Sequence, residues 1–344
     1  MDNKLRAIRF PMFLLEPAHV PFALCESIYL FFAVWIANGK RAWSGDYFAR
    51  LNRMKFYANR AQDALPQTVL YGAVMEHFTR ARRDGKTPKC LVIGYDGARA
   101  DAPAITAGDK EAGIQALLND SGAAWNVFAG GNLGNLQKTD TAPGWMTMLT
   151  GRWAAQKDGG GHGVTGNNIP KAREPKVLFT ELLERGLTGQ TAFVVSWDGH
   201  FASETASYRN DIAYSEEQGL NARWITEEND TATFERTLAE LRAPAAGMVM
   251  CILEHCDNAD GGRGSYNPVY VDEMRQAERE ACALIQAVKA RPGYGSEDWL
   301  LIITSDHGGT HKGHGNQFAE TRQVFLVSNK RLEFGAQEKN RFFL

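Results

Sequence analysis

The sequence lacks a surplus of charge of either sign, because 38 lysines and arginines stand against 40 aspartates and glutamates among its 344 residues. Without a basic excess, binding of a nucleic-acid duplex is not expected. The five cysteines form no CxxC pair and are odd in number, so a reducing compartment is the simpler assumption. No secretory signal is recognisable, since the first ten residues include charged side chains and no small-residue cleavage site follows. We therefore expect a cytoplasmic protein.

Long apolar runs are also missing from the sequence. Residues 29–37 (YLFFAVWIA) are strongly apolar but too few to cross a bilayer, so we expect a buried helix and no membrane span. Apolar residues recur at helical spacing over residues 26–38 and 47–78, and Pro66 is expected to divide the second stretch. The charged segment 80–89 contains glycine and proline and marks a boundary. We expect a helical N-terminal extension or cap over residues 1–86 and an α/β catalytic domain over residues 87–344.

From residue 90 onward, short apolar runs alternate with segments of helical periodicity. The pattern predicts strands at residues 90–95, 125–129, 191–196, 247–253, 300–304 and 324–328. It predicts helices at residues 111–118, 142–149, 177–184, 231–241 and 270–289. Strands that alternate with helices indicate an α/β fold with a mostly parallel sheet and helices on both faces.

Three of the predicted strands lead into a carboxylate, namely Asp96, Asp257 and Asp306. Because the carboxyl ends of parallel strands lie along one edge of a sheet, these side chains can converge there. Carboxylates that close together repel one another unless a cation lies between them. His307 and His314 follow Asp306 in a glycine-rich loop. Mixed carboxylate and imidazole ligands favour one or two Zn²⁺ ions, with Mn²⁺ as the alternative.

Thr141 stands at the expected start of the helix over residues 142–149. There its hydroxyl would lie near free backbone N–H groups and the positive end of a helix dipole, which suits phosphate binding. A nearby metal would lower the pKa of the hydroxyl and make it a nucleophile at neutral pH. Taken alone, Thr141 is better explained as a helix N-cap. Asp198 and His200 also follow a predicted strand, but a solvated loop is the expectation for them.

Four motifs in order then resemble the alkaline phosphatase superfamily, and most closely its type I phosphodiesterase / nucleotide pyrophosphatase branch: VIGYDGARAD, TAPGWMTMLTG, HGVTGN and TSDHGGTHKGHG. The resemblance covers roughly residues 90–328 and implies an alkaline-phosphatase-like fold. It implies that Thr141 attacks phosphorus and forms a phosphothreonine intermediate. It further implies a metal at Asp96, Asp306 and His307, a second metal at His314, and contact of Asn167 with a non-bridging phosphoryl oxygen.

One segment departs from the family pattern. The family supplies its second metal through Asp-x-x-Gly-His-x-x-Gly, whereas DNADGGRG places Gly261 where the histidine belongs. Either Asp257 and His314 hold the second metal with help from Asp260 or His311, or that site is weak or absent. His255 precedes Asp257 and is expected to pack in or beside the sheet.

The resemblance implies a metal-dependent hydrolase of phosphate esters, a phosphodiesterase or phosphomonoesterase acting on a small molecule such as a nucleotide. The alternatives that stay open are a sulfatase, a phosphonate hydrolase or a phosphomutase of the same superfamily, and a non-catalytic binding protein with a degraded second metal site. An inserted loop over residues 203–226 and the N-terminal helices are expected to select the substrate. Lys138 and Arg99 either neutralise a terminal phosphate or are solvated.

Overall fold

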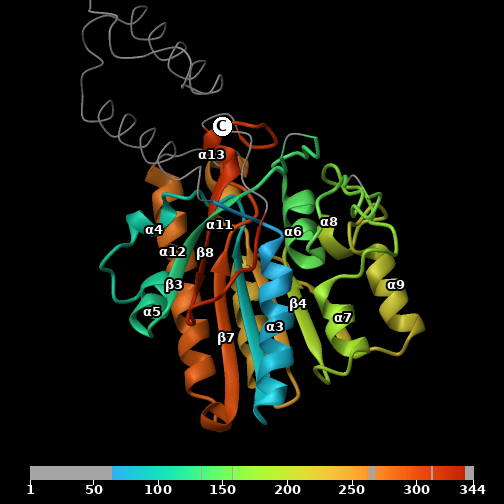
Figure 1. Ribbon diagram of the computed structural model, residues 1–344. Helices are drawn as coiled ribbons and strands as arrows, with labels where there is room; N and C mark the ends of the chain where they lie inside the picture. The colour runs from blue at the N-terminus through green and yellow to red at the C-terminus, as the bar shows by residue number, and fades with distance from the viewer. Residues whose placement is uncertain (1–63, 133, 157, 263–267, 311–312, 338–344) are drawn as a thin grey trace, which may run out of the picture.

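The computed structural model describes residues 64–132, 134–156, 158–262, 268–310 and 313–337 (Figure 1). Its centre is an eight-stranded sheet in the order β1-β3-β8-β7-β2-β6-β4-β5. The strands are β1 (Leu65–Pro66), β2 (Thr87–Tyr95), β3 (Ala123–Phe128), β4 (Thr191–Val195), β5 (Ala222–Thr226), β6 (Met248–Leu253), β7 (Glu297–Thr304) and β8 (Gln323–Ser328). All neighbours are parallel except that β8 runs antiparallel to both β3 and β7. The predicted mostly parallel sheet is therefore confirmed.

The helices vary widely in length. The longer ones are α3 (Val69–Arg83), α6 (Thr141–Thr150), α9 (Arg209–Glu217), α10 (Asp230–Arg242), α11 (His255–Gly262) and α12 (Pro268–Lys289). The shorter ones are α4 (Ala102–Ile105), α5 (Gly113–Asn119), α7 (Leu178–Glu184), α8 (Asp198–Phe201), α13 (Ala319–Arg322) and the 3₁₀ turn η2 (Tyr294–Ser296). Among the described residues, no helix combines the length and apolarity that a bilayer crossing requires.

The central strands are apolar at nearly every position because both faces of the sheet are covered. In β2, Cys90 and Val92 pack into one buried cluster with α3, α6 and α7. Leu91 and Ile93 point the other way, into a second cluster with α5, α10 and α12. Figure 1 shows α3 and α7 on one side of the strands and α5 and α12 on the other. Side chains that alternate between two apolar cores are what fix this layered arrangement.

Two stretches differ from the expectation. Residues 203–226 are not an open loop, because they contain α9 and the edge strand β5, which pairs with β4. Within segment 80–89 the connection is confined to residues 84–86, since α3 continues to Arg83 and β2 begins at Thr87. Both were missed because charged residues on the solvated faces interrupt the apolar pattern.

The expected N-terminal extension is described only from residue 64 onward. Within it, β1 pairs with β3 and α3 packs on the sheet, so residues 65–83 belong to the layers of the α/β domain. The helices expected over residues 26–38 and in residues 47–63 lie outside the described residues. An extension or cap over residues 1–63 stays a prediction.

Candidate metal centre and nucleophile

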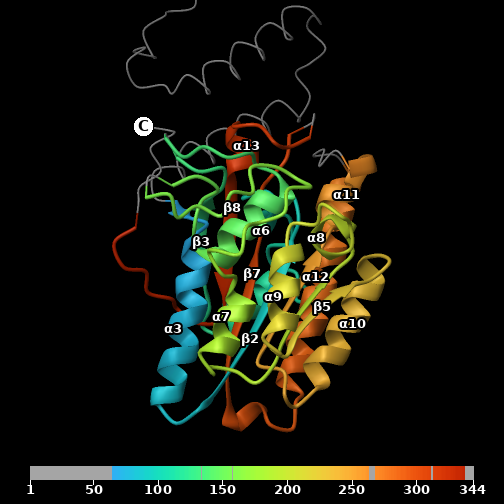
Figure 2. The same cartoon turned by 90° about the vertical axis from the view of Figure 1, so that its right-hand side faces the viewer.

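The three predicted carboxylates follow three neighbouring strands of the sheet. Asp96 follows β2, Asp306 comes shortly after β7, and Asp257 lies in the first turn of α11 after β6. Since β2 lies between β7 and β6, the sheet order brings the three strand ends together. Both cartoon views place α6, α11 and α13 toward this end of the sheet (Figures 1 and 2).

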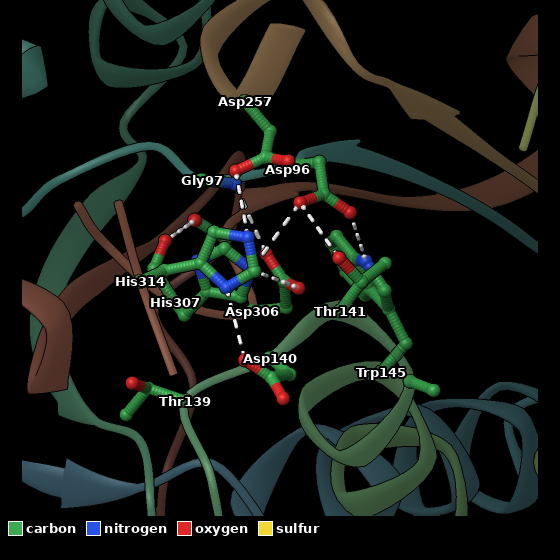
Figure 3. A network of polar contacts seen from close by, with 12 residues as sticks. Asp96, Gly97, Thr139, Asp140, Thr141, Trp145, Asp257, Asp306, His307 and His314 are labelled. Atoms are coloured by element: carbon green, nitrogen blue, oxygen red, sulfur yellow. Dashed lines mark hydrogen bonds and ion pairs between the residues drawn. The ribbon is translucent and has the colours of Figure 1, made fainter. Parts of the chain in front are cut away.

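Two groups of side chains could each surround one ion, and they share an imidazole. Asp96, Asp306 and His307 have ligand atoms within 4.8 Å of one another, and so do Asp257, His307 and His314. His307 Nε2 lies 3.5 Å from Asp96 Oδ1 and 3.4 Å from Asp306 Oδ2. His314 Nε2 lies 3.5 Å from Asp257 Oδ1, and its ring stacks on that of His307 with centroids 4.3 Å apart (Figure 3).

Helix α6 brings a hydroxyl to this cluster. Thr141 is the first residue of α6, is almost fully buried, and donates from Oγ1 to Asp96 Oδ1 over 3.3 Å. Trp145, one turn later, donates from Nε1 to Asp96 Oδ2 over 2.9 Å (Figure 3). Gly144 lets the helix come this close, because a Cβ there would lie 2.8 Å from Asp306 Cβ. Thr141 is therefore not the N-cap of α6, because Asp140 occupies that position. The Thr141 hydroxyl faces Asp96.

The other threonines near the site use their hydroxyls elsewhere. Thr139 Oγ1 donates to the Asn316 carbonyl over 2.6 Å. Thr147 Oγ1 bonds to Gln137 and His162, and Thr150 Oγ1 donates to the Met146 carbonyl. Of these hydroxyls, only that of Thr141 has a hydrogen bond with the carboxylate cluster.

The start of α6 is less open to anions than the sequence suggested. The Ala142 N–H donates to Asn167 Oδ1 over 3.0 Å, Pro143 has no N–H, and the Gly144 N–H donates to the Asp140 carbonyl. These backbone donors are therefore already used. Because Asn167 accepts through Oδ1, its amide Nδ2 is a donor that could serve an oxyanion beside Thr141.

The carboxylates lie where ionisation is costly. Burial raises the pKa of Asp96 to about 6, although hydrogen bonds from Trp145 and Thr141 oppose the rise. Burial and the charges of Asp96 and Asp257 raise the pKa of Asp306 well above its usual range. Burial, followed by the charge of Asp96, also raises the pKa of Asp257. Each of these carboxylates would ionise more readily with a cation among them.

The two imidazoles differ in protonation. Burial lowers the pKa of His307 to about 4, so this ring is neutral at pH 7. Burial opposes protonation of His314 as well, but its hydrogen bond to Asp140 and the charge of Asp257 raise its pKa to about 9. A metal at His314 would therefore have to displace a proton, which makes binding there dependent on pH.

The donor set fits a divalent ion of the zinc type. Asp257 Oδ1, Asp306 Oδ2 and His307 Nε2 are buried and have no hydrogen-bond partner. Unpartnered buried polar atoms cost free energy, and these three belong to the two groups of side chains that could each surround a cation. Oxygen and imidazole nitrogen are the ligands that Zn²⁺ and Mn²⁺ take in proteins.

The proposed helpers of the second metal are placed only in part. His311 lies outside the described residues, and Asp260 lies in α11 but its side chain is not among those described. His255 turns away from the cluster, with Nδ1 3.0 Å from Glu273 and Nε2 3.0 Å from Glu280. His255 thus packs beside the sheet in an ion-pair group and does not replace the missing histidine.

The structure also places the remaining residues that the sequence analysis named. His200 is fully buried among aromatic rings, so a solvated loop was wrong for this residue, whereas Asp198 is exposed. Arg99 is buried and pairs with Asp101, so it is not solvated. Lys138 keeps 64% of its side chain exposed, 4.0 Å from Asp140. The described contacts therefore leave Lys138 available to a negatively charged substrate group.

Sequence reasoning missed three residues at the site. Asp140 bonds to His314, and Trp145 bonds to Asp96. Glu254, the residue directly after β6, is a further buried carboxylate whose pKa is raised by burial and by the charges of Asp96 and Asp230. The position of Glu254 at a strand end was the same signal that identified Asp96. For Asp140, nothing local to the sequence indicated a partner 174 residues away.

The family model of type I phosphodiesterase / nucleotide pyrophosphatase matches residues 90–330, and the chain belongs to this family. A search among curated proteins gives no match.

Solved structures give distant matches. The 2-O GAG sulfatase BT1596 is 11% identical with a TM-score of 0.46, and the match covers 71% of this chain and 64% of that one. An inactive variant of murine ectonucleotide pyrophosphatase / phosphodiesterase 5 in complex with AMP is 18% identical with a TM-score of 0.42, covering 64% and 57%. The periplasmic domain of EptC from Escherichia coli, in complex with Zn, is 13% identical with a TM-score of 0.40, covering 70% and 72%. The chain thus spans less than two thirds of the length of the first two.

Proposed function

We propose that the protein is a metal-dependent hydrolase of phosphate esters with Thr141 as its nucleophile. The observation that carries this proposal is the hydrogen bond from Thr141 Oγ1 to Asp96, a member of the group of side chains that can surround an ion. A hydroxyl that is buried beside a metal ligand at the first residue of a helix is placed for attack on an ester held at the same ion. Membership in the phosphodiesterase family makes phosphorus the expected centre.

The residues of the chain have separate tasks in this proposal. A bound divalent ion supplies Lewis-acid polarisation of the ester and lowers the pKa of a nearby hydroxyl. Asp96 orients Thr141 so that an oxygen lone pair faces the ester, and Trp145 fixes Asp96 from its other oxygen. As the phosphorus–oxygen bond to Thr141 forms, the Thr141 O–H bond breaks and its proton passes to solvent, while the bond to the leaving group breaks and that group departs as an alcohol after taking a proton from water. A second water then cleaves the phosphothreonine, which releases phosphate and returns the proton to Thr141.

Asn167 has a positioning and a charge-balancing task. Its Oδ1 accepts from the Ala142 N–H and so fixes the amide beside Thr141. Its Nδ2 then donates to a non-bridging phosphoryl oxygen, where charge grows in the transition state. Because the Ala142 N–H is used by Asn167 and Pro143 has no N–H, the Asn167 amide adds a donor beside the start of α6.

The test compares Thr141→Ala with Thr150→Ala, a control in the same helix whose hydroxyl bonds only locally. Nitrophenyl phosphate, bis-nitrophenyl phosphate, phenylphosphonate and sulfate esters are offered with Zn²⁺ or Mn²⁺, and metal content is measured in parallel. We expect Thr141→Ala to lose at least about 10³-fold in turnover at unchanged metal content, and Thr150→Ala to keep its turnover.

Each contrary result has a distinct meaning. Turnover that survives Thr141→Ala removes this residue from the mechanism. Preference for the sulfate or the phosphonate ester assigns a different substrate class, and transfer of the phosphoryl group to a second substrate identifies a mutase. A wild-type protein that binds metal but turns over none of these esters is a binding protein.

A further inference from the structure

The loop that carries His314 is tied to the segment that precedes the nucleophile. The Gly315 N–H donates to the Thr139 carbonyl over 2.9 Å, and Thr139 Oγ1 donates to the Asn316 carbonyl over 2.6 Å. Between these two contacts, His314 Nδ1 lies 3.0 Å from Asp140 Oδ1 (Figure 3). His314 is thus held from the α6 side of the site.

Asp140 gives up its ordinary local task to make this contact. It occupies the N-cap position of α6, where an aspartate normally accepts from a backbone N–H of the first turn. No such bond is present, and the carboxylate faces His314 instead. Its second partner, Lys138, is 4.0 Å away with 64% of its side chain exposed, and such a pair contributes little.

Gly315 makes room for the same carboxylate. Its backbone has φ +84°, and a Cβ there would lie 2.6 Å from Asp140 Oδ1. Two positions far apart in the sequence, a non-capping Asp140 and a glycine at 315, therefore serve one hydrogen bond. This is a stronger indication of a specific role than the distance alone.

The bond determines which nitrogen of His314 faces the cluster. An ionised carboxylate only accepts, so Nδ1 carries a hydrogen and donates it to Asp140. The other nitrogen, Nε2, points at Asp257 Oδ1 over 3.5 Å, and that oxygen is buried without a hydrogen-bond partner. A carboxylate that fixes the outer nitrogen of a metal-ligating histidine is a recurrent arrangement in metal sites.

We propose that Asp140 is a positioning residue, which holds His314 so that its Nε2 and Asp257 bind a second divalent ion although position 261 lacks the histidine. The proposal rests on the metal dependence assumed in the proposed function. It is tested by metal binding, which does not require turnover.

The experiment is equilibrium dialysis of the full chain against buffered Zn²⁺ with elemental analysis, for wild type, Asp140→Ala, Asp140→Asn and the control Asp158→Ala, whose carboxylate lies on an exposed loop. We expect two zinc ions in the wild type. Asp140→Ala should weaken one of them about 10- to 100-fold and leave the other unchanged. Asp140→Asn, which keeps an oxygen acceptor, should restore part of the affinity, and Asp158→Ala should behave as wild type.

A second variant guards against misfolding of Asp140→Ala. Gly315→Ala keeps Asp140 but forces its carboxylate aside and strains the backbone at φ +84°, so a loss confined to one zinc ion is expected, whereas general misfolding would weaken both ions. Unchanged binding of every zinc ion in both variants overturns the proposal, as does equal weakening of both ions. Wild type that binds two ions but hydrolyses no ester overturns the proposed function alone and leaves this inference standing.

Discussion

Replacement of Asp96 by asparagine should stabilise the metal-free protein and destabilise the metal-loaded one. Asp96 is fully buried, and burial raises the pKa of its carboxyl from 3.8 to about 6. The folded protein therefore holds this proton more tightly than the unfolded chain does. The stability that the proton confers is complete below pH 3.8 and is lost as the pH rises through 6. At about 1.4 kcal/mol per pH unit, the loss amounts to about 3 kcal/mol at neutral pH.

Asparagine keeps the shape of the side chain and one oxygen acceptor but stays neutral at every pH. It loses one acceptor for the Thr141 and Trp145 hydrogen bonds, which costs about 1 kcal/mol. It also removes a charge that raises the pKa of Asp306, a change in the same direction as the main effect. At pH 8 in chelator, we therefore expect the unfolding free energy of Asp96→Asn to exceed that of the wild type by about 1–3 kcal/mol. At pH 4 it should not exceed that of the wild type.

The assay is urea unfolding at both pH values, with chelator and with excess Zn²⁺. In zinc at about 1,000 times its dissociation constant from the wild type the order should reverse, because such a ligand stabilises the wild type by about 4.1 kcal/mol and a variant that no longer binds it by almost nothing. A variant that is less stable than wild type in chelator at pH 8, and that gains as much from zinc, would show that the Asp96 carboxylate neither destabilises the metal-free fold nor binds zinc.

Two further predictions address α6 and a buried histidine. Gly144→Ala places a Cβ 2.8 Å from Asp306 Cβ, so we expect a loss of about 1–3 kcal/mol in unfolding free energy and at least about tenfold in ester turnover. The control is Gly72→Ala in α3, where nothing lies within 4 Å, and it should lose neither. Burial and the charge of Lys171 lower the pKa of His162 to about 3, and the Val164 N–H donates to its Nδ1 over 3.1 Å. The folded state keeps this ring neutral, so the unfolding free energy should fall by about 1.4 kcal/mol per pH unit below pH 6.5. His162→Gln should lessen that slope. An identical slope in both proteins would contradict a neutral, buried His162.

The central strands were predictable because they are buried on both faces. β2, β6 and β7 are runs of apolar residues that no helical period explains, and each leads into a carboxylate. For Asp96, Asp257 and Asp306 the sequence predicted only that their strands end at one edge of the sheet. It did not predict the strand order that makes the three strands neighbours. The half-exposed strand β5 was missed, because its burial pattern is mixed.

Contacts between loops that are distant in the sequence could not be predicted from the sequence alone. The Asp140–His314 bond joins residues 174 positions apart, and nothing in either segment alone indicates the other. Asp140 looked like an ordinary residue before a helix, and only the folded loop reveals that its carboxylate serves an imidazole. The same holds for Trp145, which reads as a core residue until its indole N–H is found on Asp96.

The most direct test of the account is anomalous diffraction at the zinc edge from crystals of the zinc-loaded chain. We expect one anomalous peak among Asp96, Asp306 and His307, close to Thr141 Oγ1, and a second peak between Asp257 and His314. Zinc bound only at other places, with none within ligand distance of Asp96 and Asp306, would contradict the claim that the strand ends of this sheet form a metal centre.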